Sequence, residues 1–389
     1  MLESLLNKTI ELKKKQKEIL YLSTKSGNKI TNLKIHRELS PLGWHIMHCL
    51  YIEAIWIRSK ILNDDKLEKK FKKIADAAVV SIENRGKVLP RAETIIRMAQ
   101  KIFKENVTIL ERLIYKKNKN ILMKDLNYFL DFLNQHHAQH IENMKNILNI
   151  SNMVYGNKKY NSTKLIEPSN FTFSGIKIKE GMYRIGANKK KFFYDNEIPN
   201  HKVFLKDFTI SKYILTISEW LGFIEEGGYS KKKYWSSAGW NWKAKNKIAY
   251  PFNWVFIDRN KFIVSTYKGF ISPSSEMPVT NISIYELEAF AKFNNCRLPH
   301  ELEWEAAYAK IMGKYKVWEW SSNKFFGYKG FTPFPYKEYS MPWFDNEYFT
   351  LRGGSSYTLK DIKRASFRNF YKPSTRYILS GGRLVATSY

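Results

Sequence analysis

The segment Asn134-Gln-His-His-Ala-Gln-His-Ile-Glu142 lies near the end of an apolar pattern with helical spacing, from about Leu122 to Leu148. His136 and His140 are four residues apart, so a helix places both rings on one face, roughly 5–6 Å apart at Cβ. That separation allows both rings to bind one metal ion. Glu142 lies off this face, where it could orient a neighbouring ligand.

A second pair of histidines occurs in Trp44-His-Ile-Met-His48, in the same predicted domain. An isolated H-x-x-x-H motif more often consists of surface or core histidines than of metal ligands. Two helices that bring three imidazoles into one bundle, however, form a pattern that bundle cores use for metals. The residues alone leave His45 and His48 as competitors for the third ligand.

Length and charge narrow the class of protein. The chain has 389 residues, enough for two domains, and its 44% hydrophobic content favours large cores over disorder. The net charge of +29 comes mostly from Lys spread along the chain. It predicts either a surface for nucleic acid or anionic lipid, or a solvated Lys-rich surface. We favour the second, because no stripe of Arg and aromatic residues stands out.

Cysteine content and the N-terminus predict a cellular location. Cys49 and Cys296 are too few for a disulfide framework, which favours a reducing compartment. The N-terminus carries Glu3 and lacks a basic-then-apolar signal segment. No uninterrupted apolar run reaches the roughly 18 residues of a membrane span. We therefore expect a soluble, cytoplasmic protein.

Residues 1–150 show helical periodicity almost throughout. Ser40-Pro41 has the residue types of a helix start, an N-cap followed by a first-turn proline. A poorly patterned basic stretch covers 66–92. Long helices are predicted over Leu2–Ser23, from Ser40 to about Leu62, over Glu93–Lys117 and over Leu122–Ile150. Four such helices predict an antiparallel bundle.

The composition and the hydrophobic periodicity of the sequence change after residue 150. Residues 151–170 have the composition of a linker, and from 171 onwards Gly, Pro, Trp and Tyr become frequent. Short alternating runs at 172–178 and 201–205 predict strands. Helical segments are expected at 216–227, 283–294 and 299–309. Residues 171–389 therefore predict a loop-rich α+β domain, and such loops often carry sites.

Seven fragments stand in order in this second domain. They are Gly181-Met-Tyr-Arg-Ile-Gly186, Pro278-Val-Thr-Asn-Ile-Ser283, Arg297-Leu-Pro-His-Glu-Leu-Glu-Trp-Glu305, Val317-Trp-Glu-Trp-Ser321, Leu351-Arg-Gly-Gly-Ser355, Arg368-Asn369 and Gly382-Arg-Leu384. Together they resemble the formylglycine-generating-enzyme-like fold, a variant of the C-type lectin architecture, and the first domain resembles the DinB-like four-helix bundle. The combination resembles the EgtB-like sulfoxide synthases, as do Phe193-Tyr-Asp-Asn-Glu197 and Gly227-Gly-Tyr229.

The resemblance implies a non-haem iron oxidoreductase of ergothioneine-type biosynthesis. Such an enzyme uses O2 to join a thiol sulfur to the imidazole of trimethylhistidine, also called hercynine. The implied Fe(II) ligands are His48, counted from Trp44 in W-x-x-x-H, and His136 and His140 from H-x-x-x-H-x-E. Three imidazoles on one octahedral face leave three positions open. Zinc also fits histidines but has no redox chemistry, and a hydrolytic zinc site stays open.

The resemblance also implies residues that contact the histidine substrate. Gln139 and Asn369 occupy positions that contact it in the family, and Arg368 precedes Asn369. In one branch this segment continues with Trp-Asp, whose Asp helps to bind γ-glutamylcysteine, whereas here it continues with Phe370-Tyr371. Free cysteine or another thiol is therefore the better hypothesis. The rings of Phe370 and Tyr371 are candidates to meet the trimethylammonium group.

Other candidates concern the thiol and the proton donor. Arg85 and Arg91 lie where the family has basic residues for the thiol's carboxylate, which Arg binds well, but each also fits a plain surface arginine. The loop at 325–340 offers Tyr328, Tyr336 and Tyr339 as proton donors, of which we take Tyr336 and Tyr328. We expect this loop and the 368–371 turn to face His136 and His140 across a cleft between the domains.

Single residues argue against several other activities and metal sites of the same fold. A copper-dependent sulfatase-maturing enzyme needs a cysteine pair, and only Cys296 lies in the second domain. Lys316 stands where the fold's calcium site often has Asn, which argues against calcium. The chain ends at Tyr389 without the methyltransferase domain of ovothiol-pathway relatives. Two alternatives stay open: the same iron site with another sulfur or selenium donor, and a non-catalytic binding protein with a basic surface.

Overall fold

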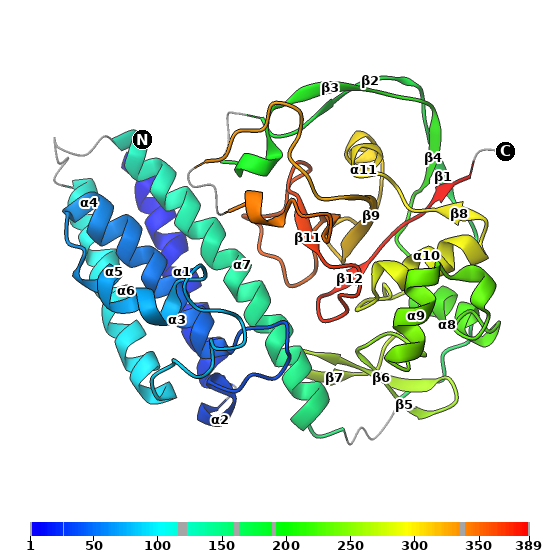
Figure 1. Cartoon of the computed structure of the whole chain (residues 1–389), viewed down its shortest axis with the longest axis horizontal. Coiled ribbons are helices and arrows are strands. Elements are labelled where there is room, and N and C mark those ends of the chain that lie inside the picture. The colour runs from blue at the N-terminus through cyan, green and yellow to red at the C-terminus, as the bar shows by residue number, and fades with distance from the viewer. Residues whose placement is uncertain are drawn as a thin grey trace. The chain divides into compact units, whose positions relative to one another are not determined.

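The computed structural model describes residues 2–25, 27–115, 123–158, 163–188, 192–334 and 339–387. The chain divides into two compact units. The first comprises Met1–Gly156 with the short segments Tyr267–Gly269 and Leu359–Ile362, and the second comprises Asn157–Thr266, Phe270–Thr358 and Lys363–Tyr389. The first unit is helical and the second mixes strands with short helices (Figure 1). The predicted order of a helical part followed by an α+β part is confirmed.

Long helices dominate the first unit. Its elements are α1 (Leu2–Lys25), α2 (Asn28–Thr31), α3 (Leu42–Glu53), a π-helical turn (Ala54–Ser59), α4 (Lys60–Leu62), α5 (Lys66–Ala75), α6 (Ala92–Tyr115) and α7 (Met123–Tyr155). Helices α1 and α3 each pack against both α6 and α7. No helix in the described part of the chain is long and apolar enough to cross a membrane.

Three details of the predicted helices are wrong. Pro41, not Ser40, is the N-cap of α3, and the Ser40 hydroxyl instead accepts a hydrogen bond from Arg85. The basic stretch after residue 65 begins with α5, whose buried Phe71 and Ala75 lie four residues apart among lysines. Helix α7 continues to Tyr155, into the segment predicted as a linker.

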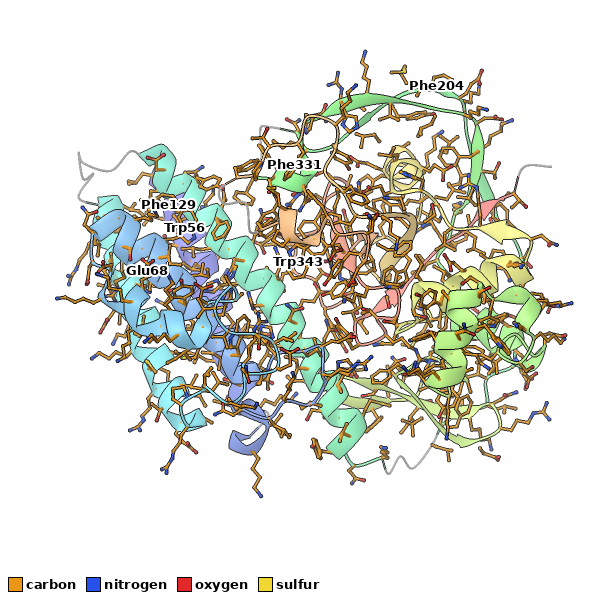
Figure 2. All side chains as sticks on the ribbon, in the orientation of Figure 1. Trp56, Glu68, Phe129, Phe204, Phe331 and Trp343 are labelled. Carbon is orange, nitrogen blue, oxygen red and sulfur yellow. The ribbon has the colours of Figure 1, made fainter. Side chains whose placement is uncertain are left out.

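Aromatic packing holds the π-helical turn against α7. The Trp56 ring centroid lies 4.9 Å from that of Phe129 and 5.1 Å from that of Phe132 (Figure 2). Tilted ring pairs at this separation add to the stability that burial provides. The turn therefore continues the α3 face that packs on α7, despite the change in helical hydrogen bonding.

The second unit contains four small sheets. Their strand orders are β1-β4-β13-β8, β11-β10-β9-β12, β2-β3 and β5-β6-β7. The strands are β1 (Gly175–Ile178), β2 (Gly181–Ile185), β3 (His201–Leu205), β4 (Phe208–Ser211), β5 (Trp254–Asp258), β6 (Lys261–Thr266), β7 (Gly269–Ile271), β8 (Cys296–Arg297), β9 (Trp318–Lys324), β10 (Phe349–Gly353), β11 (Asn369–Tyr371), β12 (Ser380–Gly381) and β13 (Val385–Ala386). Neighbours in these sheets are mostly antiparallel, but β12 pairs with β9 in parallel.

Each described α-helix of the second unit starts at a residue whose side chain caps it. These helices are α8 (Ile217–Glu225), α9 (Ser237–Lys245), α10 (Ile284–Phe293) and α11 (Glu301–Ala307). Thr216 caps α8 and Ser283 caps α10, each paired with a Glu three residues later, Glu219 and Glu286. This reciprocal pair of hydrogen bonds satisfies two backbone N–H groups that have no partner within the helix. Because the cap is encoded locally, the predicted helix starts at 216 and 283 agree closely with the observed N-caps. Helix α9 was not predicted.

A buried ion pair joins two of the seven sequence fragments that resemble the family. Arg383 donates to both carboxylate oxygens of Glu319, over 2.5 and 3.0 Å, and also to the backbone carbonyls of Ser211, Lys212 and Met312. Arg383 is 0% and Glu319 1% exposed. The charged residues of the 317–321 and 382–384 fragments therefore stabilise the core of the second unit.

We predict that Glu319→Ala strongly destabilises the protein. The substitution leaves the Arg383 guanidinium buried without its anion, which costs about 3–5 kcal/mol. Urea unfolding followed by circular dichroism measures the loss. Asp207→Ala is the control, because its partner Lys177 and Asp207 itself are 68% and 56% exposed, and such pairs contribute about 0–1 kcal/mol. Equal losses in the two variants would contradict the prediction.

Candidate metal centre

Helices α3 and α7 bring three histidines of the first unit together. One nitrogen each from His48, His136 and His140 lies within 4.8 Å of the others. The Nε2 atoms of His136 and His140 are 3.1 Å apart, because the two residues are separated by one helical turn. The His48 ring centroid lies 5.1 and 4.9 Å from those of His136 and His140. Imidazole binds divalent metals at roughly 2.0–2.1 Å, so nitrogens at these separations fit one ion.

Two of the three rings are oriented by their second nitrogen. His48 Nδ1 is 2.7 Å from the Ala75 carbonyl, which only accepts, so Nδ1 carries the proton and Nε2 holds the free lone pair. Histidines that bind metals often donate their other ring N–H to a backbone carbonyl, which fixes the orientation of the ring. His140 Nδ1 is 2.7 Å from His45 Nδ1. His45, the competitor for the third ligand, therefore contacts the side of His140 that faces away from His136.

The buried rings are neutral near pH 7. Burial lowers the pKa of His48 to about 4 and that of His45 to about 3. It also holds the pKa values of His136 and His140 well below the ordinary range, and the neighbouring rings add to this effect. Neutral imidazole is the form that binds metals. The site therefore offers lone pairs without first having to release protons.

An aromatic stack covers His48. The indole of Trp44 lies almost parallel to the His48 ring, with centroids 4.7 Å apart, and the Arg85 guanidinium carbon lies 3.9 Å from the Trp44 ring. Arg85 also donates to Ser40 Oγ and the Val80 carbonyl. Burial lowers the Arg85 pKa to about 10, so it stays a cation. Arg85 thus contacts the Trp44 ring that stacks on His48. Arg91, by contrast, is exposed at the start of α6.

A second group of potential ligands overlaps the first. Ligand atoms of Cys49, His136 and His137 also lie within 4.8 Å of one another, and Cys49 and His137 are fully buried. Burial and the nearby charge of Glu53 raise the pKa of the Cys49 thiol well above its ordinary value. Because metals bind the thiolate, this group is the weaker candidate.

The other predicted residues of α7 flank the histidines. Gln139 is half-buried beside His140, and Glu142 is buried at 7% exposure. His137 contacts Glu53 Oε1 over 2.8 Å and is not part of the three-histidine group.

In the second unit, strand β11 carries three predicted substrate residues, all half-buried. They are Asn369, Phe370 and Tyr371. The Asn369 carboxamide oxygen accepts from the Phe370 backbone N–H over 3.0 Å. Phe370 stacks on Phe325, with centroids 4.2 Å apart, and also contacts Trp343, which Figure 2 labels. One face of the Phe370 ring is therefore already covered.

The structure argues against substrate binding by Arg368 and proton donation by Tyr328. Arg368 is buried and donates to both oxygens of Glu301, over 2.7 Å each, and to the carbonyls of Asn196 and Phe326. Tyr328 is 9% exposed, with the Arg368 guanidinium 4.2 Å from its ring. Burial raises the Tyr328 pKa. Both side chains belong to a buried ion-pair network.

Among the tyrosines of the 325–340 loop, Tyr336 lies outside the described residues and Tyr339 is half-buried. Tyr339 stacks on Tyr194 with centroids 4.2 Å apart. The next residue, Ser340, donates to Asp195 Oδ1 over 2.5 Å and accepts from Asn196 Nδ2 over 3.0 Å. The short helical turn Asp195–Glu197 therefore holds the end of this loop.

The same turn also holds the segment that leads to Asn369. Glu197 Oε2 accepts from Arg364 Nε over 2.8 Å and from Ser366 Oγ over 2.7 Å. This role of the 193–197 segment was not predicted from its resemblance to the family. The only signal in the sequence was the pair of carboxylates in this segment, Asp195 and Glu197, which need polar partners when they are buried.

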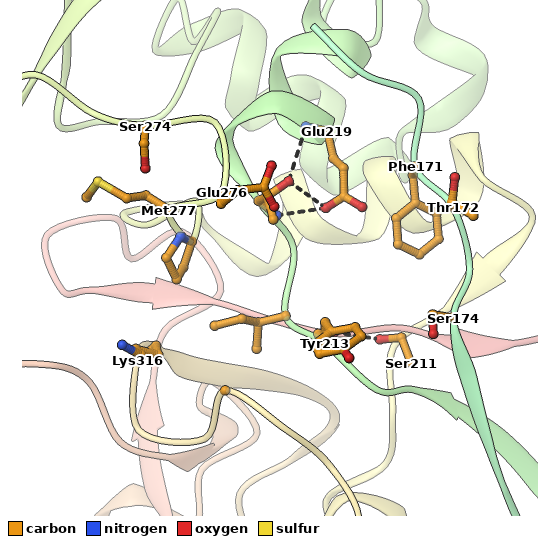
Figure 3. A pocket seen from close by; sticks show the side chains of 14 residues that line it. Phe171, Thr172, Ser174, Ser211, Tyr213, Glu219, Ser274, Glu276, Met277 and Lys316 are labelled. Atoms are coloured by element: carbon orange, nitrogen blue, oxygen red, sulfur yellow. Dashed lines mark hydrogen bonds between the residues drawn. The ribbon is translucent and has the colours of Figure 1, made fainter. Parts of the chain in front are cut away.

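The second unit also has a cavity of about 540 Å3, shown in Figure 3. Its lining includes Glu219, Glu276 and Lys316, but none of the predicted site residues. This cavity is therefore separate from the candidate centre.

The comparisons with known proteins agree with the sequence fragments. Residues 167–316 match the family described as sulfatase-modifying factor enzyme 1-like domain. A protein named hercynine oxygenase from Mycolicibacterium thermoresistibile is 33% identical over 242 residues, covering 49% of this chain. The EgtB-like resemblance is confirmed.

Two further relatives of this chain have related names. The hercynine oxygenase of Mycobacterium tuberculosis is 32% identical over 238 residues, covering 49% of this chain. Ergothioneine biosynthesis protein 1 of Schizosaccharomyces pombe is 26% identical over 253 residues, covering 55% of this chain and 30% of its own length. The matches cover 53% and 55% of the two bacterial proteins, so this chain spans about half the length of the curated relatives it matches.

We predict that replacing His48, His136 or His140 by Ala sharply weakens metal binding. Loss of a ligand should exceed the roughly 10–100-fold cost typical of an outer-shell partner. Isothermal titration of the metal-free protein with Co(II) under anaerobic conditions measures the affinity. His36→Ala is the control, since His36 lies outside the cluster. Unchanged affinity in two of the three variants would refute the ligand set.

We predict that Asp195 makes the protein less stable as pH rises from about 4 to 6. Burial raises its pKa from 3.8 to about 6. The folded state therefore holds this proton more tightly, and the stabilisation is complete below pH 4 and lost as pH rises through 6. Urea unfolding at a series of pH values should show a flatter profile for Asp195→Asn than for wild type. The exposed Asp207→Asn variant should follow wild type, and parallel profiles for all three proteins would contradict the prediction.

Proposed function

We propose that this chain is an Fe(II)- and O2-dependent sulfoxide synthase, which joins a thiol sulfur to the imidazole ring of trimethylhistidine in ergothioneine-type biosynthesis. One observation carries the proposal: three neutral, converging histidines occur in a chain whose relatives are named hercynine oxygenase. We further propose that α1, α3, α6 and α7 form the DinB-like four-helix bundle of such enzymes.

The donor set fits Fe(II). A bound Fe(II) would supply the one-electron steps with O2 that side chains cannot perform. His48, His136 and His140 would hold it, and three imidazole ligands leave positions open for sulfur, substrate imidazole and O2. The hydrogen bond from His48 Nδ1 to the Ala75 carbonyl directs the opposite nitrogen of that ring to the centre. Zinc would fit the same donors, but it offers no redox chemistry.

Substrate recognition is proposed for residues of both units. Gln139 and Asn369 would donate hydrogen bonds to the histidine betaine, and Tyr371 with Phe370 would meet its trimethylammonium group, a contact of roughly 0.5–2 kcal/mol. Arg85, a half-buried cation next to Trp44, would bind the carboxylate of the thiol substrate.

Cysteine is the proposed sulfur donor. In one branch of the family an Asp after the Arg-Asn-Trp segment helps to bind γ-glutamylcysteine, and Tyr371 stands at that position here. A phenol cannot provide the negative charge of that Asp, so γ-glutamylcysteine would lose this partner. Tyr336 is the proposed proton donor, because Tyr328 is occupied in the buried arginine network.

Product analysis tests the function. Protein purified without oxygen is assayed for iron, then mixed with O2, trimethylhistidine and one donor from a panel of cysteine, γ-glutamylcysteine and a selenium compound. We expect iron retention, O2 uptake, and a sulfoxide of the cysteine conjugate by mass spectrometry. A product formed only with a donor other than cysteine would identify that compound as the substrate in place of cysteine. Iron-free protein with no O2 uptake for any donor would favour a binding protein with a basic surface.

We predict that Asn369→Ala weakens use of the histidine betaine without loss of iron. Removing one hydrogen bond should raise KM for trimethylhistidine roughly 2- to 10-fold. Steady-state kinetics and metal analysis of the same sample measure both quantities. Asn246→Ala is the matched control, since Asn246 is exposed at the end of α9. Loss of iron in Asn369→Ala would contradict the proposed role.

A further inference from the structure

A buried carboxylate lies beside the three histidines. Glu53, the last residue of α3, is 0% exposed. Its Oε1 accepts from Gln16 Nε2 over 2.8 Å and contacts His137 Nε2 over 2.8 Å. Its Oε2 accepts from Asn106 Nδ2, also over 2.8 Å. These partners come from α1, α7 and α6, so this one side chain links α3 to the three other long helices.

The contact defines the protonation of His137. A carboxylate only accepts hydrogen bonds, so the Nε2 atom of His137 must carry a proton. Glu53 in turn receives three side-chain donors, and neither Lys nor Arg is among them in its described hydrogen bonds. Arg58 is one step further away, donating to Asn106 Oδ1 over 2.8 Å. The Glu53 charge is therefore satisfied only when all four helices are in place.

The position of His137 connects this network to the metal ligands. Successive residues of an α-helix are rotated by about 100°, so His136 points to a different side of α7 from His137. Holding the His137 ring against Glu53 fixes the rotation of α7 about its axis. That rotation decides where His136 points and, one turn later, where His140 points.

The spacing on α3 has the same consequence. His45, Cys49 and Glu53 recur every four residues and share one face. This face meets α7 at both ends, because His45 contacts His140 and Glu53 contacts His137. His48 lies next to this face and is therefore turned towards the pair on α7. The Glu53–His137 contact thus fixes the rotation of α3 and of α7 about their axes, and these are the two helices that carry the ligands.

A purely structural role explains the carboxylate less well. Burying a charge is costly, and well-packed apolar residues often replace buried charged groups with no loss of stability. What apolar residues cannot provide is a directional contact that specifies one rotation of a helix. The buried glutamate therefore fits a need for geometry better than a need for stability.

We propose that Glu53 is a positioning residue for the candidate metal centre, acting through its hydrogen bond to His137. This inference rests on the proposed function only in taking His48, His136 and His140 as the ligands. Glu53 itself does not touch the metal or the substrates in this proposal.

The first test compares Glu53→Gln with wild type, using Co(II) as the probe. The variant keeps the shape of the side chain but removes its charge and one acceptor. We expect Co(II) binding to weaken about 10- to 100-fold, as for other outer-shell partners, and the ligand-field absorption bands to shift. Glu105→Gln is the matched control, because Glu105 receives Arg58 at the outer edge of the same network and is 42% exposed. It should bind Co(II) like wild type.

A second pair of variants separates positioning from general destabilisation. His137→Gln keeps an N–H group that reaches towards Glu53, whereas His137→Leu removes it at similar volume. We expect His137→Gln to retain the wild-type Co(II) spectrum and His137→Leu to resemble Glu53→Gln. Urea unfolding of each metal-free variant records stability separately. If Glu53→Gln does not fold, the comparison of His137→Gln with His137→Leu tests the positioning role by itself.

The outcomes distinguish the two proposals. Wild-type protein that binds no Co(II) would refute the metal centre, and with it the proposed function. Wild-type binding together with identical affinities and spectra for folded Glu53→Gln, or for His137→Gln and His137→Leu, would overturn only the role of Glu53. In metal-free protein, nitrogen NMR should also report the His137 Nε2–H form in wild type and a changed form in Glu53→Gln.

Discussion

The packing of α3 against α7 is the contact on which the candidate metal centre depends. His48 comes from one helix and His136 and His140 from the other, so neither helix makes the site alone. At this contact, buried imidazoles have low pKa values and stay neutral. Bringing three such rings together removes them from water without full hydrogen bonding, and the buried His136 Nδ1 atom has no hydrogen-bond partner among the described residues. A bound metal would offset part of this cost.

The second unit uses a different device, the buried arginine–carboxylate pair. Arg352, Arg368 and Arg383 are all buried and each contacts a glutamate. An arginine with several donors can join backbone carbonyls of distant loops to one carboxylate. This explains how a unit with short strands and long loops holds a defined shape. Arg352, Arg368 and Arg383, which all stand in the family fragments, thereby stabilise the core of the second unit.

Residue types and spacing were sufficient for much of the fold and for two of the three candidate ligands, His136 and His140. Helical periodicity predicted the long helices, and the fragments of the second domain identified its family because they are tied to local turns, caps and buried pairs. The H-x-x-x-H spacing placed His136 and His140 on one face, since that follows from helical geometry alone. Helix α5 was missed because its two buried residues, Phe71 and Ala75, are hidden among lysines.

Only the tertiary structure decided which side chains meet. His45 and His48 look equivalent in sequence, but the Ala75 carbonyl orients His48 and the ring of His140 meets His45. Glu53 and His137 gave no signal, because they lie 84 positions apart and pair only when α3 packs on α7. The sequence by itself determined which residues could bind a metal, through local spacing. The tertiary structure decided their orientation, because hydrogen bonds between helices depend on contacts that no local pattern encodes.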